Sequence, residues 1–202
     1  MIPAGTIMTT IKNKSDIVIQ TYSEVVFYPF APTSEMVNIA DIAHACALNC
    51  RFNGHLKTHY SVAQHCVLTA QLIWEQTRDP ILALWGLLHD GSEAYIADLA
   101  SPIKKGIPGY KETEKAIQAA IIAKYKLPEE EPPIVKEVDL RLLVTEARDL
   151  MPRSWLLRHG WKYNAEPYTQ FTIDGWIWEK AEQEYLKTFE WLMLERVTGQ
   201  AA

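Results

Sequence analysis

The sequence predicts an all-α fold, a single-domain helical bundle that carries a small β-hairpin at its N-terminus. Apolar residues recur at spacings of three and four along most of the chain, as they do on the buried face of a helix. The prolines fall between these stretches, where a residue that breaks helices belongs. Hydrophobic residues make up 48% of the 202 positions and charged residues 22%, which is the balance of a globular protein.

The N-terminal segment is the one region with a strand pattern. Its first thirty residues alternate apolar and polar side chains around the polar run 13–16, as in residues 17–19 and 25–28. This alternation predicts a small hairpin. From residue 35 onward the period changes to that of a helix.

The predicted helices follow one another with short connections. The first covers residues 35–50, where one buried stripe is formed by Met36, Ile39, Ile42, Ala43, Cys46 and Ala47. The further predicted helices cover residues 59–77, 80–90, 92–98, 110–126, 132–150 and 174–197.

A chain of 202 residues is the size of one ordinary domain. We divide it into an N-terminal hairpin extension (1–31), a helical core (35–150) and a C-terminal Trp-rich loop and helix (151–202). The aromatic residues of this last part are expected to pack the C-terminal helix onto the bundle or to form a subunit contact, because aromatic side chains favour both. They are Trp155, Trp161, Trp176 and Trp178. We therefore expect a homo-oligomer.

Composition also narrows the function classes. No apolar run approaches the ~20 residues of a membrane helix, and the N-terminus lacks a signal-peptide pattern, so we expect a cytoplasmic protein without membrane contact. The net charge of −5 argues against stable binding to nucleic acid, which needs a basic face. The cysteines Cys46, Cys50 and Cys66 lack a CxxC spacing, so they predict buried thiols and not a disulfide framework.

The strongest chemical signal is the pair His89-Asp90, which directly follows the apolar run 82–88. An ionised carboxylate in such a place costs several kcal/mol unless a cation or hydrogen bonds compensate it. Taken alone, the dipeptide is most simply a hydrogen-bonded pair in the core. Whether it binds a metal depends on further candidate ligands elsewhere in the chain.

His65 and Asp139 are two further candidate ligands, each on a separate predicted helix among apolar neighbours. Together with His89 and Asp90 they can converge on one divalent ion (Mn, Co, Fe, Zn or Mg) and leave positions open for water and substrate. Glu93 lies four residues after His89, so on one helix the two would share a face, and Glu93 would reach a metal-bound water. The pattern predicts a catalytic metal site.

The order His65, His89-Asp90, Asp139 resembles the H…HD…D signature of the HD-domain metal-dependent phosphohydrolase superfamily, over residues 35–150. With Glu93 and Asp98 the spacing is similar to that of bacterial 5'-deoxynucleotidases. This resemblance implies that Glu93 activates water and that Asp98 contacts the sugar. Because Ala94 replaces the second acid of the enzymes that hydrolyse ppGpp, that activity is disfavoured.

The same resemblance extends upstream to Arg51-Phe52, where it implies that Arg51 binds phosphate and Phe52 contacts the sugar or base. The stretches around Asp41, Arg51 and the segment 60–65 look closer to a phage and bacterial branch that includes deoxyadenosine triphosphate triphosphohydrolases. We therefore expect hydrolysis of a deoxynucleotide, favouring a dNTP that is split into nucleoside and tripolyphosphate.

The length of the phosphate chain depends on further cations, and the pair Lys104-Lys105 is the best candidate to hold a triphosphate. If the pair is only a solvated loop, a 5'-deoxynucleotidase acting on dNMPs is the alternative. A different class of function, a nucleotide sensor without catalysis, would keep the pocket but have no need of Glu93.

Overall fold

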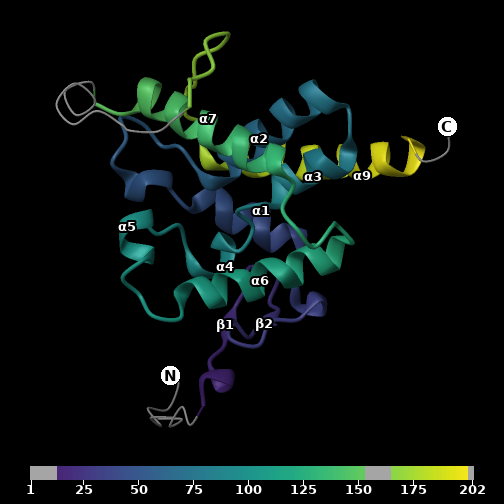
Figure 1. Cartoon of the computed structure of the whole chain (residues 1–202). Coiled ribbons are helices and arrows are strands. Elements are labelled where there is room, and N and C mark those ends of the chain that lie inside the picture. The colour runs from purple at the N-terminus through teal and green to yellow at the C-terminus, as the bar shows by residue number, and fades with distance from the viewer. Residues whose placement is uncertain (1–12, 153–164, 200–202) are drawn as a thin grey trace.

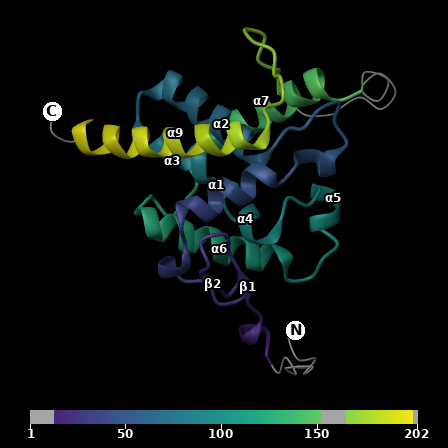
Figure 2. The ribbon, with the colours of Figure 1, turned by 180° about the vertical axis from the view of Figure 1, so that it is seen from behind.

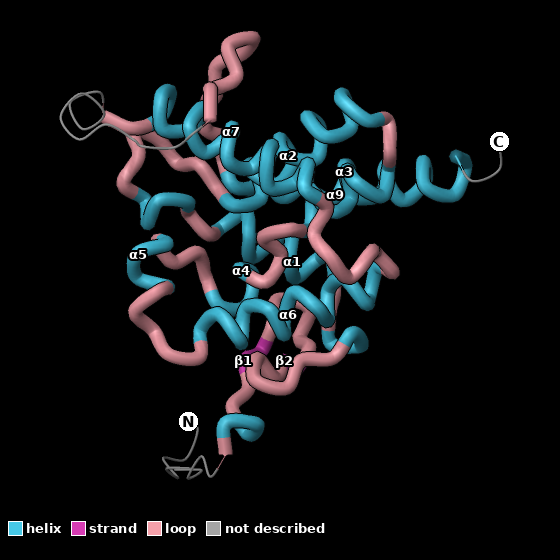
Figure 3. The backbone as a smooth tube through the Cα atoms, viewed as in Figure 1, coloured by secondary structure: helices cyan, strands magenta, loops and turns pink. Residues whose placement is uncertain are grey.

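The computed structural model describes residues 13–152 and 165–199, and in these ranges it shows the predicted all-α bundle with an N-terminal hairpin (Figures 1 and 3). The strands are β1 (Ile19–Gln20) and β2 (Val26–Phe27), paired antiparallel with Ile19 opposite Phe27. The α-helices are α1 (Ile39–Leu48), α2 (Val62–Thr77), α3 (Pro80–Leu88), α4 (Glu93–Ile96), α5 (Ser101–Lys104), α6 (Tyr110–Tyr125), α7 (Pro133–Leu150) and α9 (Trp178–Thr198). Short 3-10 helices cover Lys14–Asp16, Ser34–Met36 and Arg51–Gly54.

The core lies where α2 packs on α1 and α3, with the long α9 crossing all three (Figure 2). The buried side of α9 consists of Ala181, Tyr185, Thr188 and Leu192. Their spacing of three and four places them on one helix face. The fully buried Tyr185 donates its hydroxyl proton to the backbone oxygen of Leu87 at 2.7 Å, so even the polar tip of this core residue is paired.

Helix α7 packs on α2 from the other side, and an extended segment before α9 joins the two regions. The buried side chain of Gln64 in α2 holds this segment. Its Nε2 donates to the backbone oxygen of Asp174 at 2.6 Å, and its Oε1 accepts from the backbone nitrogen of Trp176 at 2.8 Å. The predicted helix over 174–197 is therefore wrong in its first turn, because residues 174–177 are used as an extended strap.

Two other predicted helices start too early. The structure inserts a 3-10 turn before α1, and the side chain of Asn38 caps α1 by accepting from the nitrogen of Ala40. Likewise α2 starts at Val62, because Ser61 caps it by accepting from the nitrogen of Gln64. Both are residue types that favour the N-cap position.

The polar run 13–16 does not form the hairpin turn. It is a 3-10 helix ahead of the hairpin, and the chain reverses at residues 21–24, where the nitrogen of Thr21 donates to the oxygen of Val25. Glu24 adopts a positive φ of 65° in this turn.

The Trp-rich part lies only partly in the described ranges. Trp155 and Trp161 fall outside them. Trp178 meets the ring of His44 edge-on at 5.8 Å and thereby joins the start of α9 to α1. Across residues 13–152 and 165–199, no helix has both the length and the apolar character of a membrane span.

Candidate metal centre

His65 lies at the centre of the site, on the inner face of α2, and its side chain is fully buried. Its Nδ1 is 2.6 Å from Oε1 of Glu146 on α7. Because an ionised carboxylate can only accept, Nδ1 carries the proton, and in the neutral ring Nε2 keeps its lone pair.

His89 and Asp90 follow the last residue of α3, in a turn that connects α3 to α4. The Nδ1 of His89 is 2.8 Å from the backbone oxygen of Gly86, which also only accepts. The Nε2 of neutral His89 therefore carries a lone pair as well. Gln118 of α6 secures the turn, since its Nε2 donates to the oxygen of Leu88 and its Oε1 accepts from the nitrogen of Ser92.

The two imidazole rings present their Nε2 atoms to each other at 3.2 Å. Two lone pairs at this distance repel unless a proton or another cation lies between them. Oδ1 of Asp139 is 3.1 Å from Nε2 of His65 and 3.9 Å from that of His89. Oδ2 of Asp90 is 3.7 Å and 3.3 Å from the same two nitrogens.

These separations fit a metal ion. Ligand atoms bound at about 2.1 Å from one ion stand about 3.0–3.5 Å apart, which is close to the observed spacing. His65, His89 and Asp139 form a group whose ligand atoms all lie within 4.8 Å of one another. Cys66, His89 and Asp90 form a second such group, so a thiol that the sequence did not suggest lies beside the site. This cluster of His, Asp and Cys side chains has the composition and spacing to hold a divalent ion.

The site is closed on the histidine side and open on the carboxylate side. The side chains of His65 and His89 are 0% and 6% exposed, whereas those of Asp90 and Asp139 are 25% and 37% exposed. Burial alone would raise the pKa of the Asp90 carboxyl, but His89, His65 and Arg51 together hold it far below its usual range. A ligand from solvent would approach past the two aspartates.

Glu93 was expected to share a helix face with His89, and this is wrong. The helix breaks at Leu88, and Glu93 is the first residue of the separate helix α4. Its Oε1 accepts from Nζ of Lys104 at 3.0 Å, while its buried Oε2 has no hydrogen-bond partner in the described residues. Burial, aided by Asp90 and Asp98, raises the pKa of Glu93 well above its ordinary value against the opposing charges of Lys104 and Arg51.

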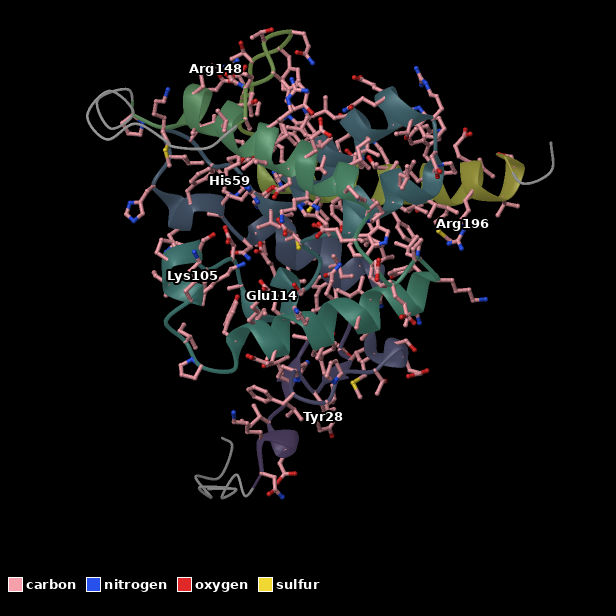
Figure 4. All side chains as sticks on the ribbon, viewed as in Figure 1. Tyr28, His59, Lys105, Glu114, Arg148 and Arg196 are labelled. Carbon is pink, nitrogen blue, oxygen red and sulfur yellow. The ribbon has the colours of Figure 1, made fainter. Side chains whose placement is uncertain are left out.

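Lys104 and Lys105 separate in the structure. The predicted loop is the short helix α5, and Lys104 reaches inward to Glu93 and to Oε1 of Glu114 on α6, 2.9 Å away. Lys105 is exposed at the edge of the molecule, as Figure 4 shows. The predicted loop is therefore wrong, because Lys104 ends a helix and its ammonium group contacts two carboxylates; that the pair holds a triphosphate stays a prediction.

Arg51 opens the 3-10 helix Arg51–Gly54 and is buried. Its Nη1 is 3.2 Å from Oδ2 of Asp90, which brings it to the ligand set. Phe52 has a left-handed backbone (φ 55°), and its ring lies 5.8 Å from the guanidinium carbon of Arg51. The structure thus places Arg51 beside the candidate ligand Asp90, and Phe52 beside Arg51.

Asp98 belongs to the same electrostatic environment. Burial and Asp90 raise its pKa, against the opposing charges of Arg51, Lys104 and His65. A hollow of about 560 Å³ adjoins α4 and is lined by residues 93–97, by Ala45 and Leu48 of α1, and by Asn49, which follows α1. Glu93 lines this hollow, whereas none of the four candidate metal ligands does.

Sequence reasoning missed Glu146. It lies on α7 two turns after Asp139, fully buried, and contacts His65, Tyr60 and Arg51. The signal that could have revealed it is a carboxylate on the same helix face as a predicted ligand.

The fold and this site define the chain as a helical protein with a cluster of buried histidines and partly exposed aspartates suited to a divalent ion. No model of a known protein family matches it. It is 42% identical over 132 residues to the uncharacterized protein YfdR of Escherichia coli (strain K12), across 65% of this chain and 71% of YfdR. The chain belongs to the same family as YfdR.

A second relative is the uncharacterized protein RCAP_rcc00048 of Rhodobacter capsulatus. It is 35% identical over 103 residues, which cover 48% of this chain and about half (52%) of the relative. Because both relatives are described as uncharacterized, the comparison supplies a family but no activity.

Proposed function

We propose that the chain is a metal-dependent phosphohydrolase of the HD superfamily that acts on a deoxynucleotide. The observation that carries the proposal is the approach of two histidine Nε2 atoms to 3.2 Å, each with its Nδ1 engaged elsewhere, beside two aspartates that reach the surface. An arginine and a buried glutamate at the same place are the further parts that phosphoryl transfer to water requires.

The ion would be held by His65, His89, Asp90 and Asp139. When bound, it supplies Lewis acidity toward a phosphoryl oxygen and acidifies a water molecule. The metals compatible with this donor set are Mn, Co, Fe, Zn and Mg, with the nitrogen ligands favouring the first four.

The protein's own groups divide the remaining work. Oε2 of Glu93, buried and without a partner in the described residues, is the atom that would accept the proton of the attacking water. Nη1 of Arg51 would balance the charge that builds on the phosphoryl oxygens. Asp98 would accept a hydrogen bond from the sugar hydroxyl, a role that rests on the resemblance to deoxynucleotidases.

The sequence and the structure favour different numbers of phosphates in the substrate. Resemblance to the phage branch favours a dNTP, but a triphosphate adds negative charge that needs further cations. Lys104 is bound to Glu93 and Glu114, and this favours the second candidate, a 5'-deoxynucleotidase acting on dNMPs.

A substrate and metal screen tests the proposal. Metal-free protein is reloaded separately with Mn²⁺, Co²⁺, Zn²⁺, Mg²⁺ or, without oxygen, Fe²⁺, and is given dNMPs and dNTPs. Inorganic phosphate from a dNMP identifies the nucleotidase, whereas nucleoside and tripolyphosphate from a dNTP identify the triphosphohydrolase. Nucleotide binding without any product under all five metals would refute catalysis and favour a sensor.

A further inference from the structure

Glu146 is the most constrained charged side chain at the site. Its exposure is 0%, and both of its carboxylate oxygens are used. Oε1 accepts from Nδ1 of His65 at 2.6 Å and from the hydroxyl of Tyr60 at 2.8 Å. Oε2 accepts from Nε of Arg51 at 3.2 Å and forms an ion pair with Nη2 of the same guanidinium group, also at 3.2 Å.

Each oxygen therefore serves a different part of the proposed machinery. One controls the ring of a metal-binding histidine, and the other holds the arginine whose remaining Nη1 points at Asp90. Burying an ionised carboxylate costs several kcal/mol, and these three hydrogen bonds and the guanidinium charge compensate that cost.

We propose that Glu146 is a positioning residue that orients His65 toward the ion and Arg51 toward the phosphoryl group. This inference rests on the proposed function. Glu146 touches neither the ligand atoms of the ion nor the substrate; it acts through Nδ1 of His65, which leaves Nε2 unprotonated, and through Nε and Nη2 of Arg51. A carboxylate behind a metal-bound histidine typically changes metal affinity about 10- to 100-fold when it is removed.

The chemistry at this position requires two acceptors. A glutamine keeps the shape but has one acceptor and one amide group that only donates, so it must turn that donor toward either Arg51 or His65. An aspartate keeps the charge but is one methylene shorter, so it cannot make both contacts from the same backbone position. Neither variant should therefore keep the contact to His65 and the contact to Arg51 at the same time.

The test measures Zn²⁺ affinity by competition with a chromophoric chelator, together with kcat and KM for whichever dNMP or dNTP the substrate screen selects. We expect Glu146→Gln to bind Zn²⁺ about 10- to 100-fold more weakly. Arg51→Lys should keep near wild-type Zn²⁺ affinity and raise KM. The matched control is Asp41→Asn, since Asp41 is also a buried, hydrogen-bonded carboxylate but pairs with Ser23 outside the site.

A measurement on the wild-type protein tests the inference even if the variants fail to fold. In Zn²⁺-loaded protein labelled with ¹⁵N-histidine, the Nδ1 proton of His65 should resonate far downfield and resist exchange with water, because its hydrogen bond to Glu146 is short and buried. Ligation of the ion through Nδ1 of His65, or rapid exchange of that proton, would overturn the inference.

The two failures are distinguishable. A wild-type protein that binds no divalent ion refutes the proposed function itself. A wild-type protein that binds Zn²⁺ normally, with a Glu146→Gln variant equal to it in Zn²⁺ affinity, kcat and KM, refutes only the role of Glu146.

Discussion

Nζ of Lys104 lies 3.0 Å from Oε1 of Glu93, and this ion pair ties the last residue of α5 to the first residue of α4. The same ammonium group is 2.9 Å from Oε1 of Glu114, so it also joins both helices to α6. Lys104 is therefore the counter-ion of the proposed proton acceptor, and its substitution should act through Glu93 and not through a phosphate chain.

From this relationship we expect Lys104→Ala to lower kcat for dNMP and dNTP alike by about tenfold or more. A hydrogen bond between charged groups contributes about 1.5–3 kcal/mol, and about 1.4 kcal/mol corresponds to tenfold in rate. Steady-state kinetics with both substrates checks it, and the exposed Lys105 provides the control Lys105→Ala. A defect confined to the KM of dNTP would restore Lys104 as a phosphate-binding residue.

Glu93→Gln should retain the metal and bind nucleotide, yet lose about 10²-fold or more in turnover, because the amide cannot accept the proton of water. Metal analysis and kinetics on the same preparation separate binding from catalysis. Glu112 is an exposed acid of α6, and Glu112→Gln should behave as the wild type. Equal rates for Glu93→Gln and the wild type would remove Glu93 from the mechanism.

Asp90→Ala should lose bound metal and activity together, since a ligand oxygen 3.3 Å from Nε2 of His89 disappears. In the wild type, metal at 100 times its Kd should add about 2.7 kcal/mol to the free energy of unfolding, provided that the ion binds only the folded chain. Thermal unfolding with and without metal shows this as a rise in Tm that Asp90→Ala lacks. The exposed Glu130 supplies the control Glu130→Ala; stoichiometric metal in Asp90→Ala would contradict the assigned ligand set.

Gly175→Ala should destabilise the fold by about 1–3 kcal/mol, the scale of overpacking where no space is left for an added methyl group. A Cβ at this position would lie 1.9 Å from the backbone oxygen of His59, and a backbone atom cannot swing aside as a side chain can. Chemical denaturation measures the loss. Gly199→Ala is the matched control, because nothing lies within 4 Å of a Cβ added there. Equal stability of the two variants would contradict the prediction and show that the segment 174–177 can shift to make room for the methyl group.

The fold class was predictable because helix periodicity is a local property. The apolar stripe through Ile42 and Cys46 and the prolines between segments predict where helices run, whatever they pack against. The helix starts were missed by three or four residues even though Asn38 and Ser61 carry a local signal, the preference of their side chains for N-caps. Residues 174–177 had no such signal, since their extended form depends on hydrogen bonds from the distant Gln64.

At the site, the sequence alone pointed to the candidate ligands, because His65, His89, Asp90 and Asp139 are polar residues in apolar surroundings and such places require compensation. Which side chains pair was decided by tertiary structure. Glu146 meets Arg51 across 95 residues and His65 across 81, and Lys104 turns from solvent to Glu93 and Glu114. A charge can lower its energy with any opposite charge within reach, so its partner is set by three-dimensional distance and by the shared burial that strengthens the pair, and neither quantity is contained in local spacing.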